Sequence, residues 1–213
     1  MKKILLILFA ISIVLVGCGD KETKVVSGNE AEEQPKINYG EELSGLVLEV
    51  VSNTSIAEEM TNVYAYLWSN TIEYNGWFPI REIANILGTD KDLLNDYFGN
   101  DGTSPNYFRG DFNEAILQLG RYYVQHGKVD DLNEGSDKIE SKIKELNNPP
   151  EEYEKVYDEI IELYTMEEEY VQMAISPSGS LISFNESRNT LSTNIVSKVK
   201  EIDVIMPSKE DKE

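Results

Sequence analysis

Two long stripes of apolar residues, separated by a short turn, limit the fold of this chain more than any other feature of its sequence. The first stripe runs from Tyr153 to Ala174 and the second from Leu181 to Ile202, with Ser176-Pro177-Ser178-Gly179 between them. In both stripes the apolar residues recur at spacings of three, four or seven positions, as on one face of an α-helix. The stripes therefore predict a long antiparallel helical hairpin, with about 25 residues or roughly 37 Å in each arm.

Helix-start and helix-stop residues predict more helices before this hairpin. Ser55-x-x-Glu58 has the capping-box pattern and predicts a helix over 54–75. Pro79 is expected to open a short helix over 80–87, which Gly88 ends. Thr89 or Asp90 is expected to cap a second short helix that ends before Gly99.

The segment 111–146 predicts two further helices. Asp111-x-x-Glu114 is expected to start the first, which ends at Gly127, and Asp130 or Asp131 is expected to cap the second. The short apolar run at 43–51 is either a strand or a helix. We favour a helix or irregular structure there, because no second convincing strand exists to pair with it.

These elements predict an all-α fold for residues 43–206. We expect an antiparallel helical bundle with a long C-terminal hairpin, a short two-helix insertion at 79–98, and helices 54–75 and 111–146 covering the apolar face of the hairpin. Residues 207–213 are charged and are expected to form a disordered tail.

The N-terminus has the pattern of an export signal. Lys2 and Lys3 precede an apolar run over 4–16, which is too short for a permanent membrane span of roughly 20 residues. Leu15-Val16-Gly17-Cys18 follows, and it resembles the lipobox of bacterial lipoprotein precursors. The resemblance implies a signal peptide over 1–17, cleavage between Gly17 and Cys18, and a diacylglyceryl thioether, with acyl chains such as palmitate, on the Cys18 sulfur.

A lipid on Cys18 implies a location on the extracytoplasmic face of the cell membrane. Residues 18–42 are charged and poor in apolar side chains, and they are expected to form a flexible tether. Without residues 1–17 the chain has 17 basic and 39 acidic side chains, a net charge of −22. Anionic lipid repels such a domain, so the acyl chains must hold it at the membrane.

The segment 147–207 is similar to the C-terminal hairpin of uncharacterised secreted lipoproteins of Gram-positive bacteria. The similar parts are Pro-Pro-Glu-Glu-Tyr at 149–153 and Ser-Pro-Ser-Gly-Ser-Leu at 176–181. The resemblance implies a Gram-positive cell and no known activity.

Composition excludes several classes of site. A single Cys and a single His exclude an internal disulfide framework, a Cys-rich zinc site and a multi-His metal motif within one chain. The acidic balance argues against a nucleic-acid partner. Neither Gly-x-Ser-x-Gly nor a phosphate-binding glycine motif occurs, so we expect no catalytic residues and no cofactor.

Three acidic or imidazole features receive structural interpretations. His126 is expected to end a helix, just before Gly127. Glu167-Glu168-Glu169 is expected to form a solvated helix face. Asn100-Asp101-Gly102 does not fit the ligand spacing of a calcium loop.

The aromatic residues around positions 77 and 108 are the best candidates for an interaction surface. We expect the irregular segments 76–79 and 99–110 to meet and to expose some of these residues: Trp77, Phe78, Tyr107, Phe108 and Arg109.

Three functions fit these observations. The favoured one is a non-enzymatic, lipid-anchored envelope lipoprotein that presents a helical domain to another envelope protein. The alternatives are a lipoprotein that binds a small ligand or solute in a pocket near the aromatic segments, and an envelope enzyme that uses one carboxylate with a raised pKa in a cleft.

Overall fold

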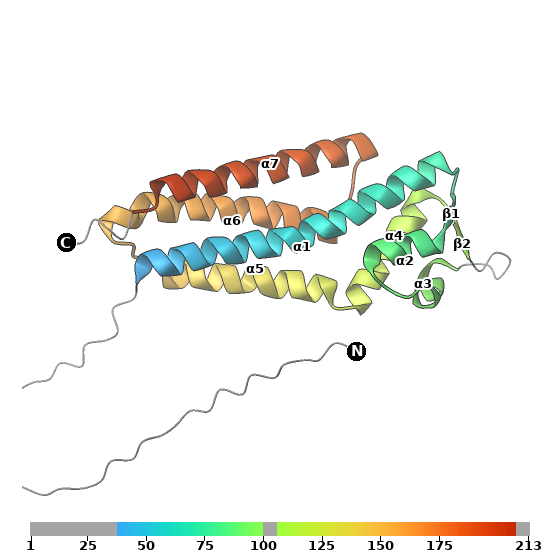
Figure 1. The fold of residues 1–213 in the computed structure, drawn as a ribbon, viewed down its shortest axis with the longest axis horizontal. Coiled ribbons are helices and arrows are strands. Elements are labelled where there is room, and N and C mark those ends of the chain that lie inside the picture. Colours follow the sequence, from blue (N-terminus) through green and yellow to red (C-terminus); the bar gives the residue numbers. More distant parts are fainter. Residues whose placement is uncertain (1–37, 100–105, 208–213) are drawn as a thin grey trace, which may run out of the picture. The chain divides into compact units, whose positions relative to one another are not determined.

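The computed structural model describes residues 38–99 and 106–207 (Figure 1). Several predicted features lie outside the described residues: the signal peptide over 1–17 with its cleavage site at Gly17 and Cys18, most of the tether, the Asn100-Asp101-Gly102 segment and residues 208–213. The fold is an all-α helical bundle, as predicted. Its helices are α1 (Tyr39–Glu73), α2 (Ile80–Leu87), α3 (Lys91–Phe98), α4 (Phe112–Gln125), α5 (Lys128–Glu145), α6 (Glu154–Ile175) and α7 (Leu181–Ile205), with a 3-10 turn at Glu151–Tyr153.

Helix α1 is one continuous helix of 35 residues, which corrects two predictions and confirms the favoured interpretation of the run at 43–51. The tether was expected to extend to residue 42, yet the helix already begins at Tyr39. The ambiguous run at 43–51 is helical and merges with the helix expected over 54–75. Ser55 and Glu58 therefore lie within the helix and form no cap. The physical reason is that Leu43, Leu46 and Val50 extend the same buried face that continues after residue 54.

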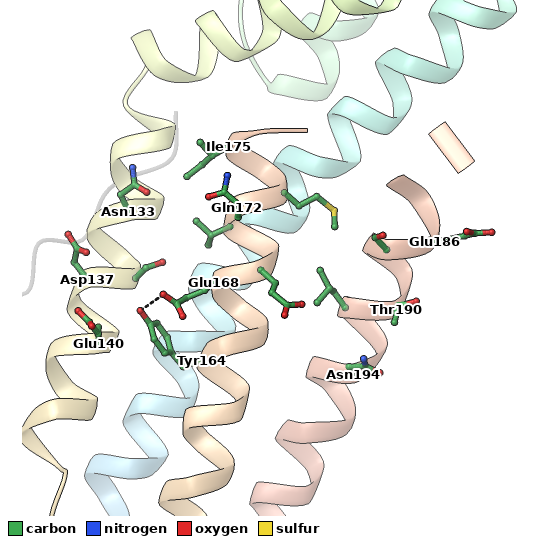
Figure 2. A pocket seen from close by; sticks show the side chains of 16 residues that line it. Asn133, Asp137, Glu140, Tyr164, Glu168, Gln172, Ile175, Glu186, Thr190 and Asn194 are labelled. Carbon is green, nitrogen blue, oxygen red and sulfur yellow. Dashed lines mark hydrogen bonds between the residues drawn. The ribbon is translucent and has the colours of Figure 1, made fainter. Parts of the chain in front are cut away.

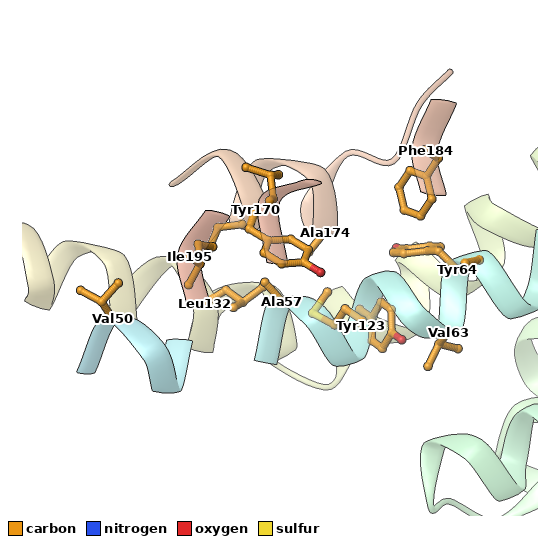
Figure 3. Close-up of a cluster of buried hydrophobic side chains, with 14 of the residues drawn as sticks. Val50, Ala57, Val63, Tyr64, Tyr123, Leu132, Tyr170, Ala174, Phe184 and Ile195 are labelled. Carbon is orange, nitrogen blue, oxygen red and sulfur yellow. The ribbon is translucent and has the colours of Figure 1, made fainter. Parts of the chain in front are cut away.

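Helices α6 and α7 form the predicted antiparallel hairpin. Lys198 on α7 contacts Glu159 and lies 2.7 Å from the Glu162 carboxylate, both on α6. Helices α1 and α5 pack against this hairpin as expected, whereas α4 packs chiefly against α1, α3 and α5. Figure 3 shows part of the resulting core, where Ala57 of α1 lies beside side chains of α5, α6 and α7: Leu132, Tyr170 and Ile195.

Helix α5 begins earlier than predicted. Gly127 lies in the left-handed region at φ +71° and precedes Lys128, so Asp130 and Asp131 fall in the first turn of the helix and do not cap it. The backbone N–H of Asp131 donates to the Gly127 carbonyl at 2.8 Å. A single glycine therefore both ends the α4 segment and begins α5, since it adopts the left-handed conformation without a Cβ clash.

The prediction of a two-helix insertion is confirmed, but the segments on either side of the insertion form a sheet that was not predicted. Gly88 ends α2 in the left-handed conformation, and the Asp90 side chain caps α3. Strands β1 (Trp77–Pro79) and β2 (Tyr107–Arg109) flank the insertion and pair in antiparallel register. Three residues are too few for a strand pattern to be recognised in a sequence, and the partner lies 30 positions away.

Candidate functional site

The β1–β2 sheet brings the five predicted interaction residues together. Trp77 pairs with Arg109 and Phe78 with Phe108, while Tyr107 lies opposite Pro79. The sheet therefore confirms that the segments on either side of the insertion meet. Because side chains alternate across a strand, the paired residues divide between two faces.

Only three of the five residues reach the surface. Trp77 is 44% exposed and Tyr107 46%, and Arg109 is also exposed. Phe78 and Phe108 are buried, so their expected place in an exposed groove was wrong. Their rings lie 5.1 Å apart, and the Phe108 ring lies 5.6 Å from that of Phe98. These inward rings hold the sheet on the insertion, and we name the outward residues Trp77, Tyr107 and Arg109 the hairpin surface.

The hairpin surface has the chemistry of a recognition site. The Arg109 guanidinium carbon lies 5.1 Å from the centre of the Trp77 ring, at cation–π distance. An open hollow of about 550 Å³ lies beside this pair and includes the exposed Ile72 and the Asp111 side chain in its lining. Tyr107 and Phe108 are not part of that lining, so Trp77 is the aromatic residue of β1 and β2 that lines this hollow.

The chain conformation around the hairpin surface depends on Gly76. Its φ is +83°, and a Cβ there would lie 2.7 Å from the Gly110 carbonyl oxygen. The N–H of Gly110 in turn donates to the Gly76 carbonyl at 3.1 Å. Glycine at 76 therefore lets the two strands close next to the Trp77–Arg109 pair.

The hairpin surface lies at the end of α1 opposite to Asn38. The 35 residues of α1 rise about 51 Å, and β1 follows α1 after three residues (Figure 1). Tyr39, at the other end of α1, donates a hydrogen bond from its hydroxyl to the Leu146 carbonyl. The described part of the chain thus begins at one end of the bundle and carries the hairpin surface at the other.

A buried polar cluster between α1, α5 and α6 was not predicted. Glu167 is fully buried, which corrects its assignment to a solvated face; Glu168 and Glu169 are exposed as expected. Glu167 Oε1 accepts hydrogen bonds from Asn53 Nδ2 at 2.6 Å and from Ser136 Oγ at 2.8 Å. No residue in the described ranges forms a hydrogen bond with Glu167 Oε2. Burial raises the pKa of Glu167, and the nearby Glu168 raises it further.

The sequence did contain a signal for this burial. Glu167 lies four positions after Leu163 and three before Tyr170, on the same helical stripe as these buried residues. A raised pKa is what the enzyme alternative requires. However, the Glu167 side chain is sealed in the core, so a substrate cannot reach it in this conformation.

An open groove of about 1030 Å³ lies along α5, α6 and α7 (Figure 2). Five carboxylates line it, and none of the other lining residues is basic: Asp137, Glu140, Glu168, Glu169 and Glu186. The Tyr164 hydroxyl donates to Glu168 at 2.9 Å. Across the described ranges, no three acidic, Cys or His residues are grouped closely enough to hold a metal ion.

His126 occupies the predicted position at the end of α4. Its ring stacks on Tyr122 with centres 4.1 Å apart, and its Nδ1 lies 2.8 Å from the Tyr122 carbonyl oxygen. These contacts are those of a residue that ends a helix.

Comparisons with known proteins add no relative. No family model, curated protein or solved structure matches the chain. Within the part of the chain that the structure describes, no helix combines the length and apolar character of a membrane span.

Proposed function

We propose that the chain is a non-enzymatic, lipid-anchored protein of the cell envelope that presents its helical bundle to a partner protein. The hairpin surface is the proposed contact site. The anchor is the diacylglyceryl group on Cys18, and the cell is Gram-positive. The observation that carries the proposal is the exposed Trp77–Arg109 pair, with Tyr107 beside it, at the end of α1 opposite to the start of the described chain.

The residue types support a protein partner. Trp, Tyr and Arg are the residues most often found to dominate the binding energy of protein interfaces. Here they project from a sheet whose other face is fastened to the core by Phe78 and Phe108. A rigid surface loses little conformational entropy on binding, so more of its contact energy appears as affinity.

The position of the hairpin surface also suits an anchored protein. Cys18 and Asn38 are separated by 20 residues, a stretch that can span at most about 70 Å when extended. Two acyl chains on Cys18 hold a protein stably at a membrane. The length of α1 then adds about 51 Å between the tether and the hairpin surface.

The anchor is tested in intact cells with the Cys18→Ala variant. The parent protein is expected to stay in the membrane fraction after a carbonate wash and to show a diacylglyceryl-modified, cleaved N-terminus by mass spectrometry. Cys18→Ala is expected to leave the membrane fraction. An unmodified thiol or an uncleaved leader in the parent protein would refute the anchor.

The contact site is tested by site-specific photo-crosslinking in the same cells. A photoreactive residue at position 77 or 107 is expected to capture one defined protein, which is then purified and titrated with the parent domain. Ile182 on α7, which is 72% exposed and apart from the hairpin surface, is the matched control position. In the titration, Trp77→Ala is expected to weaken binding by about 2 kcal/mol or more. Equal capture from position 182, or unchanged binding by Trp77→Ala, would refute the site.

A further inference from the structure

A second groove lies between α4, the start of α5 and the end of α6, and we name it the α4 groove. Its volume of about 490 Å³ lies within the range of about 300–1,000 Å³ found for small-ligand sites. Most of its lining is apolar, and the residues are Tyr64, Ile116, Leu117, Gly120, Arg121, Val124, Gln125, Val129, Ile175, Ser176 and Pro177.

The apolar part of the groove is exposed to solvent. Leu117 is 59% exposed and Val124 is 58% exposed, and they lie seven residues apart on one side of α4. Ile175, from the end of α6, is half-buried against the core. An apolar ligand that covered Leu117 and Val124 would remove this surface from water, which favours binding.

The groove differs in charge from the rest of this acidic protein. The chain has 39 acidic side chains, yet the described residues contribute no carboxylate to the lining of the α4 groove. Its one charged lining residue is Arg121, which forms no ion pair with any described residue. An exposed guanidinium beside apolar surface favours a ligand that has a negative charge next to an apolar portion.

A buried hydroxyl also faces the groove. Tyr64 is only 1% exposed, and no described residue forms a hydrogen bond with its hydroxyl. Gly120 lies over this hydroxyl, and a Cβ added at 120 would lie 3.5 Å from the oxygen. The absence of a side chain at 120 therefore leaves the Tyr64 hydroxyl accessible from the groove as a hydrogen-bond donor.

We propose that the α4 groove binds a free amphipathic carboxylate, a single hydrocarbon chain with a carboxylate head. Arg121 pairs with the head, because the planar guanidinium matches the two oxygens of a carboxylate. The Tyr64 hydroxyl donates a second hydrogen bond to the head. The hydrocarbon chain covers Leu117, Val124 and Ile175. A second copy of this chain is a poorer occupant, since a symmetric contact of α4 with itself centred on Gly120 would place two Arg121 side chains together.

Two probes with the same alkyl chain and opposite charge test the proposal. The protein is the mature-length chain with Cys18→Ala, and its Leu and Val methyl groups are followed by NMR during titration below the micelle concentration. Dodecanoate is expected to shift the Leu117 and Val124 signals to saturation, whereas dodecyltrimethylammonium is expected to leave them unchanged. Equal shifts with both probes, no shift with either, or shifts mainly at another surface such as Leu48 would overturn the proposal.

Variants then separate the contributions of the head and the chain. Arg121→Gln is expected to weaken dodecanoate binding about tenfold or more, because one charge-assisted hydrogen bond is lost. Arg81→Gln on α2 is the matched control and is expected to leave dodecanoate binding unchanged. Tyr64→Phe keeps the ring and is expected to weaken binding severalfold, and Gly120→Leu is expected to block it. Unchanged affinity in Arg121→Gln, or tighter binding of dodecyl phosphate than of dodecanoate, would refute the assignment of the head. This proposal does not depend on the hairpin surface or on the lipid anchor.

Discussion

Replacing Gly135 by alanine tests the buried polar cluster directly. An alanine Cβ at 135 would lie 2.6 Å from the Asn53 Cγ and closer still to its Oδ1. Real Cβ atoms do not approach that closely, so the Asn53 amide must move. In the parent protein this amide donates to the Leu132 carbonyl at 3.0 Å, to Ser136 Oγ at 3.2 Å and to Glu167 Oε1 at 2.6 Å. The alanine therefore displaces a side chain that is only 5% exposed.

The expected cost follows from the hydrogen bonds that the Asn53 amide loses. A buried hydrogen bond contributes about 1 kcal/mol to the free energy of unfolding, and one to a charged group about 1.5–3 kcal/mol. The higher helix propensity of alanine offsets about 1 kcal/mol of this loss. We therefore expect Gly135→Ala to lower the free energy of unfolding by about 1–3 kcal/mol. In a domain of this size, each kcal/mol lowers the Tm by roughly 2–4 °C.

The effect of Gly135→Ala on the free energy of unfolding should change sign when Asn53 is absent. In an Asn53→Ala background the clash disappears, so Gly135→Ala is expected to stabilise the protein by up to about 1 kcal/mol. Gly45→Ala is the matched control, because Gly45 also lies within a helix but has nothing within 4 Å of the added Cβ. It is expected to stabilise the protein in either background.

Urea unfolding followed by circular dichroism at 222 nm measures all of these variants. Substitutions at 53 and 135 together are expected to lower the free energy of unfolding by less than the sum of their separate effects, whereas the effects of substitutions at 53 and 45 should simply add. If Gly135→Ala were as stable as Gly45→Ala, or equally destabilising with and without Asn53, the packing of Asn53 against Gly135 would be incorrect.

Three further predictions concern the cluster, a helix cap and the sheet. Burial raises the pKa of the Glu167 carboxyl above 4.5, so this group stays protonated to higher pH in the folded state than in the unfolded state. The stability that the protonated carboxyl contributes is therefore lost as the pH rises from about 4.5 through the folded pKa. Glu167→Gln cannot lose a proton, so its stability relative to the parent protein is expected to increase between pH 4 and pH 7, by about 1.4 kcal/mol for each unit of the shift; a constant difference across this range in urea titrations would contradict the burial. Asp111 accepts a hydrogen bond from the Glu114 N–H at 3.0 Å, and Asp111→Ala is expected to cost about 1 kcal/mol in urea unfolding, whereas Asp111→Asn should retain most of the stability. Gly76→Ala is expected to destabilise the protein more than Gly88→Ala does, because both glycines have positive φ but only a Cβ at 76 meets a backbone oxygen. Hydrogen exchange of the Gly110 N–H, which donates to the Gly76 carbonyl, should speed up in Gly76→Ala. Equal losses of stability in the two variants would argue against the strand pairing.

The features predicted correctly from the sequence are those that depend on nearby residues. Asp90 and Asp111 cap helices because each side chain bonds an N–H two or three residues later. Gly88 ends α2 because it adopts the left-handed conformation easily. The α6–α7 hairpin follows from two stripes joined by a short turn. In each case the relevant atoms lie within a few positions of one another along the chain.

The features that were missed depend on contacts between distant segments. The apparent capping box at Ser55 was overridden because packing against α5, α6 and α7 extends α1 through it. The orientation of Phe78 and Phe108 depends on a strand pairing across 30 residues. A position on an apolar stripe could have indicated the burial of Glu167. Its hydrogen-bond donors, however, come from α1 and α5, and the sequence predicts that these helices cover the hairpin but not which of their residues face Glu167.

The sequence alone therefore determined the helical class and most helix ends, since these are encoded by local spacing and residue type. The lipid anchor is a prediction from the same kind of local pattern. Tertiary structure alone decided which aromatic residues face solvent, which carboxylate is buried and where an acid-free groove lies. Those properties depend on which side of an element its neighbours cover, and that is settled only when distant segments pack together.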